Sequence, residues 1–173
     1  PLDSSAASDV YKRQVITGAG RGIGEGIAKS FSEAGASVVV AARRTEEIDR
    51  VAAEINESGG SAIAVTTDVT DDDAVENLAK AAIAEYGKLT TWVNNAGGSP
   101  MRMPLSELPR EEWDRTVALN LTSIYIGCTI AAKYMAKGSI INITSGAGSG
   151  PVPGSGHYGC LLYTSDAADE SRG

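Results

Sequence analysis

Three glycines, Gly18, Gly22 and Gly24, follow a short apolar run in the segment VITGAGRGIGEGIA, which begins at Val15. Glycine permits a tight turn and lets the backbone approach a pyrophosphate closely. A helix that begins in such a loop offers free N–H groups and roughly half a positive charge to a phosphate. No Gly-Lys-Ser/Thr sequence follows, so the spacing is not that of a P-loop. If a strand precedes the loop and a helix follows it, the segment predicts a dinucleotide-binding site.

Short apolar runs alternate with longer amphipathic stretches, and these elements must hold the glycine loop in place. The runs are continuous, which is typical of strands covered on both faces. We expect strands at 38–42 (VVVAA), 62–67 (AIAVTT), 90–95 (TTWVNN) and 139–144 (SIINIT), after a first strand that ends in VIT. We expect helices at 22–34, within 46–60, within 70–87 with Thr70 or Asp71 as its cap, and at 110–136. The alternation predicts right-handed crossovers and a doubly wound parallel sheet.

Composition restricts the classes of partner. The 173 residues suffice for one globular domain with a core, and the formal net charge of −7 argues against nucleic acid or anionic lipid as a partner. No apolar run approaches the roughly 18 residues that span a bilayer, and no signal peptide is recognisable at the first residues. Two cysteines do not make a disulfide framework, so we expect a cytoplasmic protein. One histidine and two scattered cysteines give no metal-ligand spacing, and we expect no metal site.

Further motifs follow the glycine loop in a fixed order. They are Asp68–Val69 at the end of the third strand, NNAG at Asn94–Gly97 at the end of the fourth, Asn120 on the long helix, Ser145 after the fifth strand and Tyr158 thirteen residues later. With T-G-x-x-x-G-I-G, this order resembles the short-chain dehydrogenase/reductase family over about residues 15–159. Within the family the chain is similar to 7α-hydroxysteroid dehydrogenase-like and 3-oxoacyl-carrier-protein reductase-like members. The resemblance implies an α/β, Rossmann-type fold, here incomplete, with the first five strands and about four helices.

The end of the second strand bears on the choice of nicotinamide cofactor. An NAD site places an acid there for the ribose 2′-hydroxyl, whereas this chain has Ala42 followed by Arg43 and Arg44. We expect no carboxylate to repel a 2′-phosphate, and a guanidinium can bind that phosphate in a bidentate manner. With Arg21 in the loop, the resemblance implies NADP(H) rather than NAD(H), with Arg43 as the ligand and Arg44 solvated. The expected cofactor-binding residues are Gly18, Arg21, Gly22, Ile23, Gly24, Arg43, Asp68, Val69, Asn95, Ala96 and Gly97.

The resemblance also implies catalytic residues for hydride transfer between a secondary alcohol and a ketone. Tyr158 is the expected general acid/base, Ser145 binds the substrate oxygen, and Asn120 fixes the helix that carries a water relay. A free tyrosine has a pKa of about 10, and in the family a lysine four residues on helps it to lose its proton. Here that position holds Leu162, and no lysine follows Lys137. We therefore expect very low turnover from this chain.

Structural alternatives accompany these assignments. Thr144, Ser149 or Ser155 could take the place of Ser145, and Asn120 could be a capping or buried amide. We expect His157 to be an exposed neighbour of the tyrosine and not the base. Cys128 lies in an apolar helical stretch and is expected to pack in the core.

The two ends do not continue the pattern. Residues 1–14 and 160–173 are aperiodic and resemble translated adapter or assembly sequence, the alternative being natural disordered tails. We expect the domain to cover 15–159, with native sequence ending at Gly159. The sequence thus predicts an NADP-dependent oxidoreductase with a small-molecule substrate, homo-oligomeric when complete. The alternative is a non-catalytic NADP-binding redox sensor or regulator of the same fold.

Overall fold

The computed structural model describes residues 12–99, 101–148 and 152–166. Five parallel strands form one sheet in the order β3-β2-β1-β4-β5. The strands are β1 (Arg13–Thr17), β2 (Ser37–Ala42), β3 (Ser61–Thr66), β4 (Thr91–Asn94) and β5 (Ser139–Asn142). The order reverses beside β1, so loops that follow β1 and β4 open a crevice at the carboxyl edge of the sheet. The predicted doubly wound parallel sheet is confirmed.

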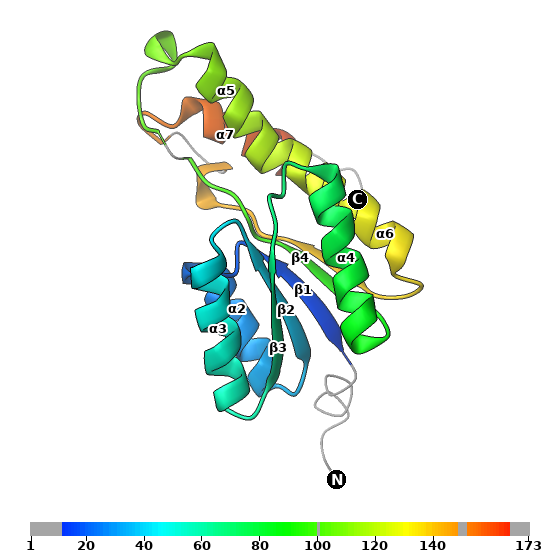
Figure 1. The fold of residues 1–173 in the computed structure, drawn as a ribbon. Coiled ribbons are helices and arrows are strands. Elements are labelled where there is room, and N and C mark those ends of the chain that lie inside the picture. The colour runs from blue at the N-terminus through cyan, green and yellow to red at the C-terminus, as the bar shows by residue number, and fades with distance from the viewer. Residues whose placement is uncertain (1–11, 100, 149–151, 167–173) are drawn as a thin grey trace.

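Helices cover both faces of this sheet (Figure 1). They are α2 (Gly22–Glu33), α3 (Thr45–Glu57), α4 (Asp72–Tyr86), α5 (Arg110–Val117), the π-helical segment η2 (Ala118–Thr122), α6 (Ser123–Tyr134) and α7 (Gly156–Asp166). Short 3₁₀ turns lie at η1 (Leu105–Glu107) and η3 (Gly146–Gly148). Helices α2 and α3 lie on one face, and α4 and α6 on the other (Figure 1).

The central strands alternate their side chains between two cores. Val15, Val39 and Trp92 pack with α4 and α6, whereas Ile16 and Val40 pack with α2 and α3. All five side chains are fully buried, as expected for parallel strands covered on both faces. Strand β5 departs from that expectation because all four of its residues are exposed. It lies at the edge of the described sheet, where only β4 pairs with it.

The helices differ from prediction in two places. The expected helix at 110–136 runs through α5, η2 and α6, but its middle is a π-helix. If these three segments are counted as one helix, the described residues contain five α-helices, whereas about four were expected. The additional helix is α7, which continues into the expected non-native segment 160–173 and ends at Asp166. Of the two predicted caps of α4, Thr70 and Asp71, the structure has Asp71, whose carboxylate accepts a hydrogen bond from the Ala74 N–H at 3.1 Å.

Strand β1 starts before the expected domain boundary at Val15, because Arg13 and Gln14 already pair with β2. Gln14 is 1% exposed, and its Oε1 has no hydrogen-bond partner among residues 12–99, 101–148 and 152–166. A buried carbonyl without a partner costs free energy that an apolar side chain avoids. Gln14 is therefore a local weak point in the central strand.

No helix in the described part of the chain combines the length and the apolar character needed to cross a membrane.

We predict that Gln14→Leu raises the free energy of unfolding by about 1–2 kcal/mol, because it removes the unpaired oxygen and keeps the volume. Gln14→Glu, which has the same shape, should lower the free energy of unfolding by about several kcal/mol, because it buries a carboxylate. Urea denaturation followed by circular dichroism measures both changes. Equal effects of the two variants would show that this side chain is not buried in the folded protein.

Candidate functional site

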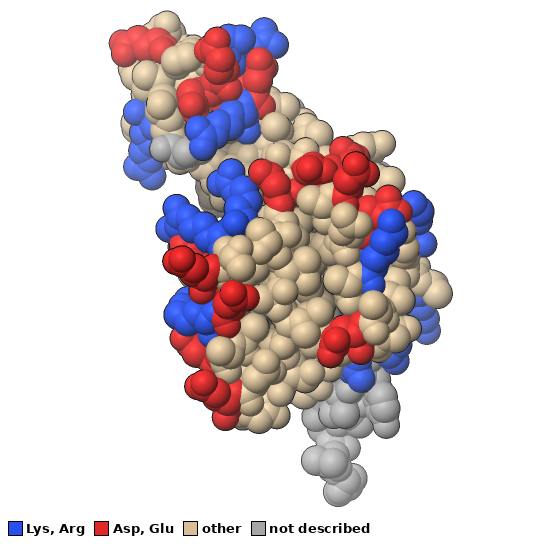
Figure 2. Space-filling model, viewed as in Figure 1, with Lys and Arg blue, Asp and Glu red and all other residues tan. Residues whose placement is uncertain are grey.

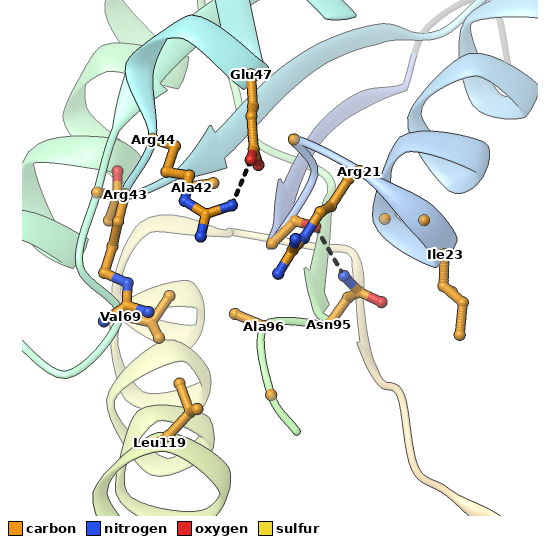
Figure 3. A pocket seen from close by; sticks show the side chains of 16 residues that line it. Arg21, Ile23, Ala42, Arg43, Arg44, Glu47, Val69, Asn95, Ala96 and Leu119 are labelled. Atoms are coloured by element: carbon orange, nitrogen blue, oxygen red, sulfur yellow. Dashed lines mark hydrogen bonds and ion pairs between the residues drawn. The ribbon is translucent and has the colours of Figure 1, made fainter. Parts of the chain in front are cut away.

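The loops that follow β1 to β4 surround a cavity of about 460 Å³ at the carboxyl edge of the sheet (Figure 3). Ten of the eleven predicted cofactor-binding residues line it, and Asp68 does not. Gly20, Ala42, Arg44, Glu47, Thr67 and Leu119 also line it. Residues from the first hundred positions of the chain and from the long helix therefore meet at one place. Three arginines, Arg21, Arg43 and Arg44, surround one side of the cavity (Figure 3).

The glycine loop approaches the loop after β4 so closely that two side chains are excluded. A Cβ on Gly18 would lie 2.9 Å from the Ala96 Cα, and one on Gly24 would overlap the Gly18 carbonyl and the Asn95 amide. Gly18 and Gly22 also have positive φ angles of 64° and 59°, which glycine adopts without strain. The three glycines thus permit the turn and the contact of α2 with the strand end.

Hydrogen bonds fix this contact. The Thr17 hydroxyl accepts from the backbone N–H groups of Asn95 and Ala96, at 3.0 and 3.1 Å, and donates to the Val93 carbonyl. The Asn95 side chain donates to the carbonyls of Thr17 at 2.9 Å and Gly18 at 3.3 Å. The ends of β1 and β4 are therefore joined by side chains as well as by the sheet.

An ion-pair network holds the outer side of the glycine loop. Arg50 on α3 donates to the Gly20 carbonyl at 3.1 Å and to the Glu25 carboxylate on α2 at 2.9 Å. Hydrogen bonds from Arg50 and Lys29 lower the pKa of Glu25 to about 2, although burial opposes the change. Glu25 is thus ionised at neutral pH and joins the two helices. Arg50 was not among the expected site residues, because it lies eight residues beyond the end of β2 and reaches the loop from α3.

The side chain of Glu47 corrects one expectation about the pocket. It lies on the first turn of α3, lines the cavity and accepts a hydrogen bond from Arg44 (Figure 3). A carboxylate is therefore present near the end of β2, although none was expected. Arg21 and Arg43 have no hydrogen-bond or ion-pair partner among the described residues, which leaves their guanidinium groups available to a ligand.

Asp68 was expected to contact the cofactor, but its side chain belongs to the following turn. The carboxylate accepts hydrogen bonds from the Thr70 N–H at 3.0 Å and from the Thr70 hydroxyl at 2.7 Å. Burial alone raises the pKa of Asp68, but these hydrogen bonds and the charge of Arg43 lower it overall. The turn satisfies the carboxylate locally, and its neighbour Val69 lines the cavity instead.

Asn120 lies in the π-helical segment and is buried. Its Nδ2 donates to the Thr116 carbonyl at 2.9 Å and to the Gly98 carbonyl at 3.0 Å, and its Oδ1 accepts from the Gly98 N–H at 2.7 Å. The bond to the Thr116 carbonyl, four residues earlier, competes with the backbone N–H that an α-helix would place there, and the helix is a π-helix at this point. Asn120 therefore fixes the loop after β4 against the long helix, as in the buried-amide alternative.

Ser145 and Tyr158 lie on neighbouring segments outside the cavity lining. The Ser145 Oγ accepts from the Ala147 N–H at 3.3 Å, at the start of η3. Turn η3 packs on α7, where a Cβ on Gly159 would lie 3.2 Å from the Ala147 carbonyl. Leu162 is 7% exposed and lies against Gly148, so an apolar side chain fills the position four residues after the tyrosine.

His157 is buried, so the expectation that it is exposed is wrong. It is 1% exposed, and its Nε2 shares a hydrogen bond of 3.3 Å with the Ser99 hydroxyl on the loop after β4. The Met103 N–H donates to the Gly154 carbonyl nearby, so this loop covers the start of α7. A loop contact of this kind leaves no periodic signal in the sequence.

The remaining alternatives fall in different surroundings. Ser155 is buried and its carbonyl accepts from the Tyr158 N–H, whereas Thr144 is exposed and Ser149 lies outside the described residues. Cys128 is half-buried beside the amides of Asn94 and Asn142, and burial raises the pKa of its thiol. It is a packing residue and a poor nucleophile.

Comparisons with known proteins identify relatives over most of the chain. A family model described as short chain dehydrogenase matches residues 12–160. A 3-oxoacyl-(acyl-carrier-protein) reductase of Synechocystis sp. is 37% identical over 92% of this chain and 68% of its own length. A 2,5-dichloro-2,5-cyclohexadiene-1,4-diol dehydrogenase of Sphingobium indicum is 39% identical over 85% of this chain and 60% of its own length.

Solved structures give the same relationship. A 7α-hydroxysteroid dehydrogenase complexed with NADH and 7-oxo glycochenodeoxycholic acid superposes with a TM-score of 0.85 and 33% identity, over 93% of this chain and 65% of that one. The chain spans about 60–68% of the length of the curated relatives that it matches.

We predict that Gly24→Ala weakens dinucleotide binding at least about tenfold and destabilises the fold, because the methyl group pushes α2 away from Asn95. The matched control is Gly26→Ala on the same helix, where a Cβ meets nothing within 4 Å. It should stabilise the fold by about 0.5–1 kcal/mol and leave binding unchanged. Fluorescence titration and urea denaturation of both variants provide the test, and equal behaviour would contradict the close contact.

Proposed function

Because the chain belongs to the short-chain dehydrogenase family, we propose that it is the cofactor-binding part of an NADP(H)-dependent oxidoreductase that interconverts a secondary alcohol and a ketone. The observation that carries the proposal is a glycine cradle flanked by two unpaired guanidinium groups, Arg21 and Arg43. The chain's residues bind and orient the cofactor, and the nicotinamide, when bound, supplies the hydride.

The residues present fit a dinucleotide. Gly18 and Gly24 leave room that any side chain would occupy, and Gly22 begins α2. No side chain caps this helix N-terminus, so its first N–H groups are free for a pyrophosphate. Ile23 is 68% exposed at the same turn and gives the cofactor an apolar surface to lie on.

The preference for a 2′-phosphate rests on the charges at the end of β2. Arg43 follows Ala42 directly, and Arg21 faces the cavity from the glycine loop (Figure 3). Two guanidinium groups without a protein partner among the described residues favour a dianionic phosphate. The similar 7α-hydroxysteroid dehydrogenase is complexed with NADH, so the proposed NADP preference rests on the charges of this chain and not on that relative.

The proposed catalytic step assigns proton transfer to Tyr158 and orientation of the substrate oxygen to Ser145. Asn120 acts through the Gly98 backbone, since both ends of its amide are engaged there. With Leu162 at the next turn of α7, the phenol has no ammonium group four residues on to assist its ionisation. We therefore expect this chain to bind the cofactor but to show very low turnover.

The same observation favours a second candidate function. Leu162 packs against Gly148 as an ordinary core residue. A protein that binds NADP(H) and needs no proton transfer loses nothing by that substitution. A non-catalytic redox sensor or regulator of the same fold is therefore the alternative, and a turnover measurement separates the two.

We also propose a cytoplasmic location, a small carbonyl or alcohol substrate and a homo-oligomer for the complete protein. The support for oligomer formation is on the long helix. Leu121 and Tyr125 are one turn apart there and are 44% and 69% exposed. Large apolar side chains on one exposed face are typical of a protein interface.

We predict that Arg43→Ala weakens NADPH binding about tenfold or more and changes NADH binding by less than about threefold, since only NADPH carries the 2′-phosphate. Arg110→Ala, at an exposed position on α5, is the control for loss of a positive charge. The dissociation constants come from fluorescence titrations. An equal loss for both cofactors would remove the basis for NADP preference.

We predict that this chain reduces ketones with NADPH no faster than its Tyr158→Phe variant. Leu162→Lys should raise turnover at least about tenfold above that background, because it places an ammonium group one turn from the phenol. Leu162→Met is the uncharged control. NADPH consumption with a panel of ketones measures each rate. Fast, Tyr158-dependent turnover by the unaltered chain would contradict the role given to the lysine, and an inactive Leu162→Lys variant that binds NADPH would favour the sensor.

A further inference from the structure

Glu47 occupies a position in the cofactor pocket that the proposed function does not use. It lies on the first turn of α3 and is half-buried, with its carboxylate directed between Arg44 and the glycine loop (Figure 3). A Cβ on Gly20 would lie 2.9 Å from the Glu47 Cβ and 3.0 Å from its Oε2. The contact with the loop and the bond from Arg44 thus hold this carboxylate at the rim of the cavity.

The pocket is therefore not uniformly positive. Arg21, Arg43 and Arg44 line it together with Glu47. The hydrogen bond from Arg44 lowers the pKa of Glu47 against the effect of burial, and the charges of Arg21 and Arg50 lower it further. Glu47 is ionised at neutral pH. Figure 2 shows acidic and basic side chains alternating along the edge of the molecule where α3 lies.

The ion pair between Arg44 and Glu47 is weak enough for a ligand phosphate to replace Glu47 as the partner of Arg44. The Arg44 side chain is 65% exposed and that of Glu47 is 30% exposed, and exposed pairs contribute little to stability. A 2′-phosphate offers Arg44 a stronger, doubly charged partner. Taking Arg44 away from Glu47 leaves the carboxylate facing that phosphate, which opposes binding.

We propose that Glu47 determines how strongly this pocket prefers a 2′-phosphorylated dinucleotide, by competing for Arg44 and by repelling the phosphate. This inference rests on the proposed cofactor function. A dinucleotide with a free 2′-hydroxyl meets neither penalty, because its hydroxyl can donate to a carboxylate. Glu47 thus narrows the difference between the two cofactors that Arg21 and Arg43 create.

The test compares Glu47→Gln with Glu46→Gln. Both remove one negative charge from the first turn of α3, but Glu46 is exposed and does not line the cavity. Fluorescence titrations give the dissociation constants for NADPH and NADH, and calorimetry gives those for adenosine 2′,5′-bisphosphate and 5′-AMP. We expect Glu47→Gln to raise the preference for the 2′-phosphorylated member of each pair about three- to tenfold. We expect Glu46→Gln to change it less than about twofold.

Arg44→Gln separates the two routes by which Glu47 acts. In the Arg44→Gln background, Glu47→Gln should have a smaller effect, because competition for the guanidinium is gone and only repulsion remains. An unchanged preference in Glu47→Gln, or an equal rise in Glu46→Gln, would overturn the inference while NADPH binding by the unaltered chain upholds the proposed function. If the folded chain, checked by circular dichroism, binds none of the four ligands, the proposed function and the inference both fail.

Discussion

The close approach of the glycine loop to the end of β4 is the constraint on which the rest of this site depends. Gly18 lies against Ala96, and Gly24 lies against the Asn95 amide, at distances that exclude a Cβ. Only hydrogen as a side chain allows α2 to begin this near the sheet. Thr17 and Asn95 then hold the two loops together by hydrogen bonds. The free N–H groups of α2 are thereby aimed at the crevice where the strand order reverses.

Charge at this crevice is arranged in two layers. On the outer side, Arg50 is bound to the Gly20 carbonyl and to Glu25, so its charge supports the loop and is not free for a ligand. On the inner side, the guanidinium groups of Arg21 and Arg43 have no hydrogen-bond or ion-pair partner in the described part of the chain. Arg44 is an intermediate case, because it forms an ion pair with Glu47 but its own side chain is largely exposed to solvent. Four arginines that look equivalent in the sequence therefore have different roles, decided by which carboxylates the helices bring near.

What the sequence could predict follows from local signals. Continuous apolar runs predicted the sheet, because this signal depends on neighbours in the chain. The cofactor-binding residues were implied by the family resemblance, and all of them except Asp68 line the cavity. Asp68 lies outside the cavity lining, and a local turn with Thr70 satisfies its carboxylate. The carboxylate of Glu47 at the pocket and the burial of His157 were not expected, because these side chains contact segments distant in the sequence, at Gly20 and Ser99 respectively. Asn120 also bonds the Gly98 carbonyl on a loop distant in the sequence, a contact that no periodicity reveals.

The two halves of the proposed chemistry depend on different parts of this structure. The cofactor pocket is built from the segments that follow β1, β2, β3 and β4, all within the first hundred residues apart from Leu119. The proposed proton transfer would instead involve α7 and the segment beside η3, which meet through Gly148, Gly159 and Leu162 and line no part of that cavity. A change in α7 can therefore remove catalysis without altering the glycine cradle. Cofactor binding is therefore the property to measure first, because the residue at position 162 does not line the cofactor cavity.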